Sequence, residues 1–280
     1  MRGLRSAHGE SFDEAAFRAA RPAAIFAQLQ QGSIECHAIS YRSDRETVSG
    51  FVLRPARSSA APLPVIIFNR GGNRDFGRLV FADLVDLAAW AEQGFIVLAS
   101  QYRGSSGSSG QDEFGGADVH DVLNLVPLAR ALGADMNKLF MAGFSRGAMM
   151  TLLALRQGAP VKAAAVIGGA SDLRRLGRDR PEMLSLYREL MPGFAERGQR
   201  LMRERSAVSF ASELQAPILI LHGGADWRVP PAQALALAER LQSAHRPYEM
   251  HIYAGDDHAL SANHADSRQR TLAWFKRHMQ

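Results

Sequence analysis

The chain has one cysteine among its 280 residues, which excludes an intrachain disulfide framework. Cys36 lies in the alternating stretch IECHAISY, and we expect it to be a buried structural thiol. No run of 18 apolar residues occurs, which argues against a membrane span. The first residues, MRGLRSAHGESFDEAAF, lack the apolar centre of a secretory signal, so we expect a cytoplasmic protein.

The positive charge is spread out rather than concentrated. Lys and Arg number 33 against 28 Asp and Glu, a formal net charge of +5. No block of five or six basic residues occurs, and no basic stripe is interleaved with aromatic residues, so we expect no nucleic-acid partner. Nothing in the sequence indicates an oligomeric state.

Short apolar runs alternate with segments of helical period along most of the chain. Two alternating stretches predict an antiparallel strand pair, at 34–41 and 46–53. Continuous apolar runs typical of buried parallel strands follow at 64–69, 95–100, 138–143, 163–168, 217–222 and 248–255. Helical periods lie between and after them, at 79–93, 117–132, 145–157, 230–244 and 267–279. This alternation predicts an α/β fold whose mostly parallel, doubly wound sheet carries helices on both faces.

Two segments fall outside this rhythm. Residues 11–31 are Ala-rich and amphipathic, and they predict a helix before the first strand. Residues 172–213 are too long for a simple crossover, and they carry nine arginines against five acidic residues between positions 173 and 205. We interpret this insertion as a helical cap within a single domain that spans 1–280. An ordinary pair of connecting helices is the alternative.

One motif predicts a nucleophile at the end of an apolar run. The segment GFSRG at 143–147 fits G-x-S-x-G, and it lies between a predicted strand and a predicted helix. Such a junction holds the serine in a strained backbone conformation and exposes its hydroxyl above the sheet at a helix N-terminus. We therefore interpret Ser145 as a nucleophile, with a tight turn and a helix-capping serine as the alternative.

A serine hydroxyl needs a base, and the base needs an acid that orients it. In a fold of this kind the chain order is Ser, then Asp or Glu, then His. Asp226 follows one late apolar run in GGADWRVPP, and His258 follows the last one in DDHAL, so we predict them as acid and base. The alternative acids are Asp172, which follows an earlier strand, and Asp256 and Asp257, whose presence turn formation explains.

The negative oxygen of a tetrahedral intermediate needs two N–H donors. We expect one from the backbone of Arg146, the residue after the nucleophile, and the other from the loop FNRGGNRDFG after the first parallel run. Gly71 and Gly72 let the backbone approach closely there, so one of their amides is the expected donor. A plain Gly-Gly turn is the alternative. His222 begins an HGG sequence, but it lies on the strand before the acid and receives no role.

With these residues placed, the chain resembles the catalytic domain of the prolyl oligopeptidase family of serine hydrolases, which has the α/β-hydrolase fold. The resemblance runs from about Val48 to the C-terminus and rests on RGG at 70–72, QYRGSSGSSG at 101–110, FGGADVHDV at 114–122, GFSRG, HGGADWRVP and DDH. It implies that Ser145, Asp226 and His258 are nucleophile, acid and base. Peptidases of the family carry a β-propeller, whose blades need roughly 40–45 residues each. Fewer than 50 residues precede the match, so we expect a catalytic domain without a propeller.

The departures from the family pattern bear on the substrate. Arg70 stands where the family has His or Tyr, and without a propeller the residues that hold a peptide's amino end are absent. We therefore expect a hydrolase of small carboxylic esters that needs no metal or cofactor. Short peptides or aminoacyl amides are the next choice, and a non-catalytic binding protein is the alternative from another class. Expected substrate contacts are Arg70, Phe144 and Trp227.

The arginines suggest one further specificity. We expect Arg70 or an arginine of the insertion to meet a carboxylate on the substrate, with a solvated basic face as the alternative.

The run GSSGSSG at 104–110 has the composition of a flexible linker. However, it lies between a predicted strand and a helix of the same alternation, so we interpret it as a folded loop near the site. We expect Arg103 to be held by Asp118 or Asp121, with a solvated side chain as the alternative.

Overall fold

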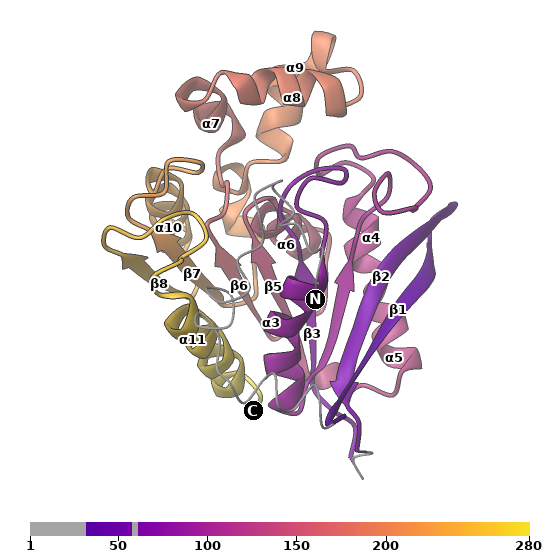
Figure 1. Ribbon diagram of the computed structural model, residues 1–280. Helices are drawn as coiled ribbons and strands as arrows, with labels where there is room; N and C mark the ends of the chain where they lie inside the picture. Colours follow the sequence, from indigo (N-terminus) through magenta and orange to yellow (C-terminus); the bar gives the residue numbers. More distant parts are fainter. Residues whose placement is uncertain (1–31, 58–60) are drawn as a thin grey trace.

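A computed structural model describes residues 32–57 and 61–280, and the helix predicted at 11–31 lies outside them. Its centre is one sheet with the strand order β1-β2-β4-β3-β5-β6-β7-β8 (Figure 1). The strands are β1 Ile34–Ser43, β2 Glu46–Pro55, β3 Val65–Asn69, β4 Ile96–Ser100, β5 Leu139–Phe144, β6 Ala163–Ile167, β7 Ile218–Gly223 and β8 Tyr248–Tyr253. β2 pairs antiparallel with β1 and β4, and the remaining pairs are parallel. All eight predicted strands and the mostly parallel sheet are confirmed.

Helices cover both faces of the sheet, as predicted. On one face, α3 and α11 pack on a core that includes Trp90, Phe140 and Phe275. On the other, α4, α5, α6 and α10 pack on a larger core. Their bounds are α3 Phe81–Glu92, α4 Val119–Leu123, α5 Leu125–Ala131, α6 Arg146–Arg156, α10 Ala232–Ser243 and α11 His264–Arg277, with a short 3-10 turn at Met136–Lys138 before β5. No helix in the described part of the chain is long and apolar enough to cross a membrane.

The prediction of one helix over 117–132 is wrong. The structure has two helices there, α4 and α5, which meet at Asn124. Pro127 is the cause, because it has no N–H to donate to the carbonyl of Leu123 and its ring crowds that carbonyl. The Asn124 side chain donates to the carbonyl of His120 at 2.9 Å and closes the first helix.

The insertion at 172–213 holds three helices, α7 Leu173–Asp179, α8 Glu182–Leu190 and α9 Phe194–Glu204. Two 3-10 turns, Ala207–Ser209 and Ala211–Glu213, lead from α9 to β7. Figure 1 shows the three helices standing beyond the carboxyl ends of the central strands. That they act as a cap over a substrate stays a prediction.

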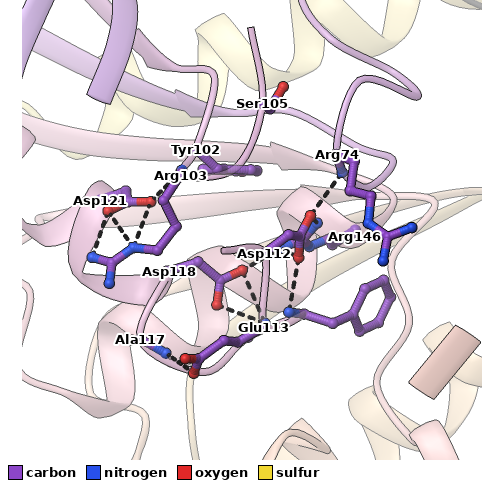
Figure 2. A network of polar contacts seen from close by, with 12 residues as sticks. Arg74, Tyr102, Arg103, Ser105, Asp112, Glu113, Ala117, Asp118, Asp121 and Arg146 are labelled. Carbon is purple, nitrogen blue, oxygen red and sulfur yellow. Dashed lines mark hydrogen bonds and ion pairs between the residues drawn. The ribbon is translucent and has the colours of Figure 1, made fainter. Parts of the chain in front are cut away.

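The Gly/Ser run is a folded loop. Arg103 forms an ion pair with Asp121 at 2.7 Å, which confirms the expected Asp121 contact (Figure 2). A second ion pair joins Arg103 to Asp44 at 2.9 Å. The loop also bonds to β2, because Ser109 N–H donates to the Thr47 carbonyl and Ser108 Oγ accepts from Ser49 N–H, both at 2.9 Å. A composition that is flexible in a linker is therefore ordered here by specific partners.

The expectation of a buried Cys36 is wrong, because the residue is exposed. It lies on β1, the strand at the edge of the sheet, where its neighbours His37 and Ala38 are exposed too. An alternating pattern predicts one buried face only where another layer covers that face.

Candidate active site

Ser145 lies at the turn between β5 and α6, with φ 55° and ψ −120°, a conformation that non-glycine residues rarely adopt. The two flanking glycines make this turn possible. A Cβ at Gly143 would lie 2.2 Å from the carbonyl oxygen of Gly147, and one at Gly147 would lie 1.8 Å from that of Asn69. The sequence pattern thus produces the strained serine that it predicted, and the residue is half-buried at the turn.

The structure brings Ser145, His258 and Asp226 together in a chain of hydrogen bonds. His258 Nε2 lies 3.0 Å from Ser145 Oγ, and His258 Nδ1 lies 2.7 Å from Asp226 Oδ2. The alternative acid Asp256 instead accepts from the backbone N–H groups of Ala262 and Asn263. That the three residues catalyse a reaction stays a prediction at this point.

Asp226 is held as a carboxylate. Its Oδ1 accepts the backbone N–H groups of Arg228 and Val229, each at 2.9 Å. Burial alone would raise the pKa of Asp226, but hydrogen bonds from His222 and His258 outweigh it and hold the pKa well below its usual range. A charged carboxylate in this position fixes the Nδ1–H tautomer of His258 and leaves Nε2 free to accept a proton from Ser145.

His222 is a site residue that the sequence reasoning missed. It is buried at the end of β7, with Nε2 at 2.7 Å from the carbonyl of Val229 and 3.3 Å from Asp226 Oδ2. Both neighbours are acceptors, so Nε2 carries the proton. His222 Nε2–H therefore faces the same oxygen of Asp226, Oδ2, that His258 contacts. The available signal was the spacing of four residues between His222 and Asp226, at the end of a strand.

Two of the expected oxyanion donors, Gly71 and Arg146, lie next to Ser145, and their role stays a prediction. A Cβ on Gly71 would lie 3.1 Å from Ser145 Cβ, so the loop after β3 passes directly against the nucleophile. Gly72 has φ +71° and could not carry a side chain, because its Cβ would lie 2.0 Å from the Phe76 carbonyl oxygen. Arg146 is the first residue of α6, where backbone N–H groups have no acceptor within the helix.

Arg70 does not face the substrate space with a free guanidinium. The side chain is 1% exposed, and its nitrogens donate to the carbonyls of Gln101, Gly71, Phe76 and Arg74 and to Ser105 Oγ. Burial lowers the pKa of Arg70 to about 10, which still leaves it charged near neutral pH. These contacts do not support the predicted bond to a substrate carboxylate, because the guanidinium is occupied in holding the loop after β3 against the Gly/Ser loop.

A buried ionic cluster lies behind the nucleophile (Figure 2). The guanidinium of Arg146 forms ion pairs with Asp112 and Asp118 and donates to the carbonyl of Gly72 at 3.0 Å. Asp112 in turn accepts the backbone N–H of Arg74 at 2.7 Å. Burial raises the pKa of Asp112, but the charge of Arg146 and the hydrogen bonds from Arg146, Arg74 and Phe114 together lower it overall. The cluster therefore joins the start of α6 to the loop that carries Gly71 and Gly72.

Ser145 and His258 open into a cavity of about 480 Å³. Phe144 and Trp227 line it, and Phe144 lies with its ring centre 5.0 Å from that of His258; that the two residues contact a substrate stays a prediction. The arginines at this cavity besides Arg70 are Arg78 and Arg228. Among the described residues that line it, none comes from the insertion, so the expected arginine of the insertion is not at the site.

The insertion instead contacts the two loops that frame the cavity. Arg180 donates to the carbonyl of Arg228 at 2.8 Å and lies over the Trp227 ring at 5.4 Å. Glu189 pairs with Arg74 at 2.7 Å. These contacts connect α7 and α8 to the loop of the acid and to the loop after β3.

Comparison with known proteins agrees with this geometry. The sequence profile of the prolyl oligopeptidase family matches residues 82–280, well over half of the chain. The chain belongs to the prolyl oligopeptidase family. It is therefore a serine hydrolase of the peptidase or esterase type, with a peptide or another small molecule as its class of substrate.

Two curated relatives illustrate that range. The uncharacterized peptidase YtmA of Bacillus subtilis is 26% identical over 247 residues, which cover 87% of this chain and 94% of YtmA. Esterase LipC of Mycobacterium tuberculosis is 26% identical, with 66% of this chain and 50% of LipC covered.

Solved structures place the chain in the α/β-hydrolase fold. A puromycin-hydrolyzing peptidase of Mycobacterium tuberculosis superposes with a TM-score of 0.74 at 26% identity, covering 87% of this chain and 39% of that one. A dienelactone hydrolase from Klebsiella pneumoniae, described as putative, superposes with a TM-score of 0.65 at 21% identity, covering 87% of this chain and 98% of that one. Much of the puromycin-hydrolyzing peptidase thus lies outside the match.

Proposed function

We propose that the protein cleaves carboxylic esters through an acyl-enzyme formed on Ser145. The observation that carries this proposal is the hydrogen-bonded chain from Ser145 Oγ through His258 to Asp226, at 3.0 and 2.7 Å. In this order the imidazole can accept the serine proton while the carboxylate stabilises the imidazolium that forms.

In the acylation step, Ser145 Oγ attacks the ester carbonyl as His258 Nε2 takes its proton. The carbonyl oxygen becomes an oxyanion and accepts from the backbone N–H of Arg146 and from that of Gly71 or Gly72. The intermediate collapses as the bond to the alcohol oxygen breaks and His258 returns the proton to that oxygen. Water then attacks the acyl-enzyme by the same route and releases the acid and Ser145.

The charges around the cavity favour an ester over a peptide with a free amino end. Such a peptide presents an ammonium group that needs a carboxylate partner. Among the described residues, two carboxylates line the cavity, and both are engaged with backbone N–H groups: Asp83 accepts from Val80, and Asp257 from Ala259 and Ser261. Arg78 and Arg228 add positive charge, which repels an ammonium. Short peptides and aminoacyl amides remain the second candidate, supported by the relationship to peptidases.

A fluorophosphonate probe tests the mechanism. We expect it to label the wild type and to leave Ser145→Ala unlabelled; equal labelling of the two proteins would contradict the assignment of Ser145. A p-nitrophenyl ester, an aminoacyl p-nitroanilide and its N-acetylated form then separate the substrates. We expect kcat/KM to be highest for the ester and lowest for the anilide with the free ammonium.

A further inference from the structure

A second cavity, of about 390 Å³, lies against the first. The two share Phe68, Asp83, Phe144 and Ala259 as walls, so the second begins beside the residues that precede Ser145 and follow His258. It extends between α3 and α11, on the sheet face with the smaller core. Its volume lies within the range of pockets that hold small organic ligands, roughly 300–1,000 Å³.

The walls of this second cavity are mainly apolar. Leu87 and Trp90 come from α3, and Ile167 lies at the end of β6. The Phe68 ring meets the indole of Trp90 edge to face, with ring centres 5.9 Å apart. A lining of this kind gains free energy by burying apolar surface of a ligand.

The charged groups at this cavity are engaged with one another or with the backbone. Arg268 pairs with Asp86 at 2.8 Å, and His264 lies 3.6 Å from the same carboxylate. Asp83 accepts the backbone N–H of Val80. A charged ligand would therefore have to break an existing pair, which favours an uncharged one.

One buried polar group in the wall has no partner in the part of the chain that the structure describes. Trp90 is 5% exposed, and its indole Nε1–H has no acceptor among the residues that the structure describes. Trp274 is equally buried, but its Nε1–H donates to the carbonyl of Ala164 at 3.0 Å. Because buried N–H groups are nearly always paired, the Trp90 donor points to an acceptor supplied by a ligand.

We propose that this cavity binds an uncharged, apolar group of the substrate next to the scissile bond, and that Trp90 Nε1–H donates to an oxygen on that group. The inference deepens the proposed function, because it takes the substrate carbonyl to lie at Ser145. Both cavities contact Phe144, so a substituent that leaves the carbonyl on that side points toward the second cavity.

A binding experiment tests the cavity without catalysis. In Ser145→Ala, the indole N–H resonance of Trp90 is identified by its absence in a Trp90→Phe version of the same protein. We expect methyl 5-oxohexanoate to shift this resonance downfield, methyl hexanoate to shift it less, and the Trp274 resonance to stay in place. A Trp90 resonance that neither ester moves would overturn the proposal, and equal shifts with both would overturn the hydrogen bond.

An activity experiment tests in the working enzyme whether the second cavity holds a group of the substrate. Leu87→Phe fills the cavity, and Leu84→Phe makes the same change on α3 at a residue that does not line it. We expect the ratio of kcat/KM for the longer substrate to that for the shorter one to fall at least about tenfold in Leu87→Phe and to stay unchanged in Leu84→Phe. One series compares p-nitrophenyl hexanoate with the acetate, and the other compares hexyl acetate with methyl acetate.

The two proposals fail separately. Unchanged ratios in both series, in a Leu87→Phe protein that melts cooperatively and still reacts with the fluorophosphonate, would overturn the cavity assignment and leave Ser145 in its role. If the wild type does not react with the probe, the proposed function fails, and the resonance of Trp90 still decides whether the cavity binds the ester.

Discussion

Arg146 and Asp112 form a two-point ion pair behind the nucleophile, with Nη1 to Oδ2 at 2.6 Å and Nη2 to Oδ1 at 2.7 Å. Arg146 also donates to the carbonyl of Gly72, and Asp112 also accepts the backbone N–H of Arg74. The side chain of the residue after Ser145 therefore holds the loop that carries the second expected oxyanion donor. We therefore infer that Arg146 is a positioning residue in addition to the expected backbone donor.

Arg146→Lys tests that positioning. Lysine keeps the charge but cannot bond Asp112 at two points and Gly72 at the same time, so the loop after β3 shifts relative to Ser145. We expect kcat for a p-nitrophenyl ester to fall about 10- to 100-fold, with a much smaller change in KM, because the loss falls on the transition state. Arg156→Lys, at the other end of α6, is the matched control and should keep kcat. A rise in KM with unchanged kcat would count against the positioning role.

The ion pair of Arg103 with Asp121 should matter for stability, because Asp121 is fully buried. Arg103→Met leaves that carboxylate without its partner, and we expect the free energy of unfolding in urea to fall by about 3–5 kcal/mol. Arg54→Met breaks an exposed pair with Glu35 and should cost less than about 1 kcal/mol. Amide exchange at residues 104–110 should accelerate only in Arg103→Met. Equal losses of stability in the two variants would mean that the Gly/Ser loop is ordered by its backbone bonds instead.

The lowered pKa of Asp226 leads us to expect that the stability of the protein depends on pH. Its folded-state pKa is lowered, so its contribution to stability is present above the unfolded value of about 3.9 and is lost as the pH falls through the folded value. Asp226→Asn removes this contribution. We therefore expect the stability difference between wild type and variant to shrink below about pH 4, by up to about 1.4 kcal/mol per pH unit. Urea unfolding from pH 7 to the lowest pH at which both proteins fold measures it, and a constant difference would contradict it.

The two buried indoles offer a matched pair of substitutions. Trp274→Phe leaves the carbonyl of Ala164 without its donor, whereas Trp90→Phe removes an N–H that has no acceptor among the described residues. Both lose similar apolar volume. We expect Trp274→Phe to lower the free energy of unfolding by about 1 kcal/mol more than Trp90→Phe, as measured by urea unfolding without ligand. A larger loss in Trp90→Phe would mean that its N–H is already bonded in the free protein.

Local patterns in the chain were enough for the sheet and for Ser145, Asp226 and His258. Buried parallel strands read as continuous apolar runs, and catalytic groups of an α/β sheet follow the carboxyl ends of those runs. The break between α4 and α5 could also have been predicted from Pro127, because a proline interrupts a helix when it lies in the interior of that helix. It was missed because the apolar period continues through it.

Other features depend on which elements meet, and no local pattern contains that information. The loops after β3 and β4 meet the start of α6. Because of this meeting, the Arg70 side chain is buried and holds the two loops together, and Arg146 pairs with two carboxylates. Cys36 is exposed because, among the residues that the structure describes, no layer covers its end of the edge strand. The sequence by itself determined the order of strands and helices along the chain and the positions of the three expected catalytic residues, because these follow from periodicity and turn chemistry. The tertiary structure alone decided which charged side chains pair and where the cavities lie, because those depend on contacts between residues far apart in the chain.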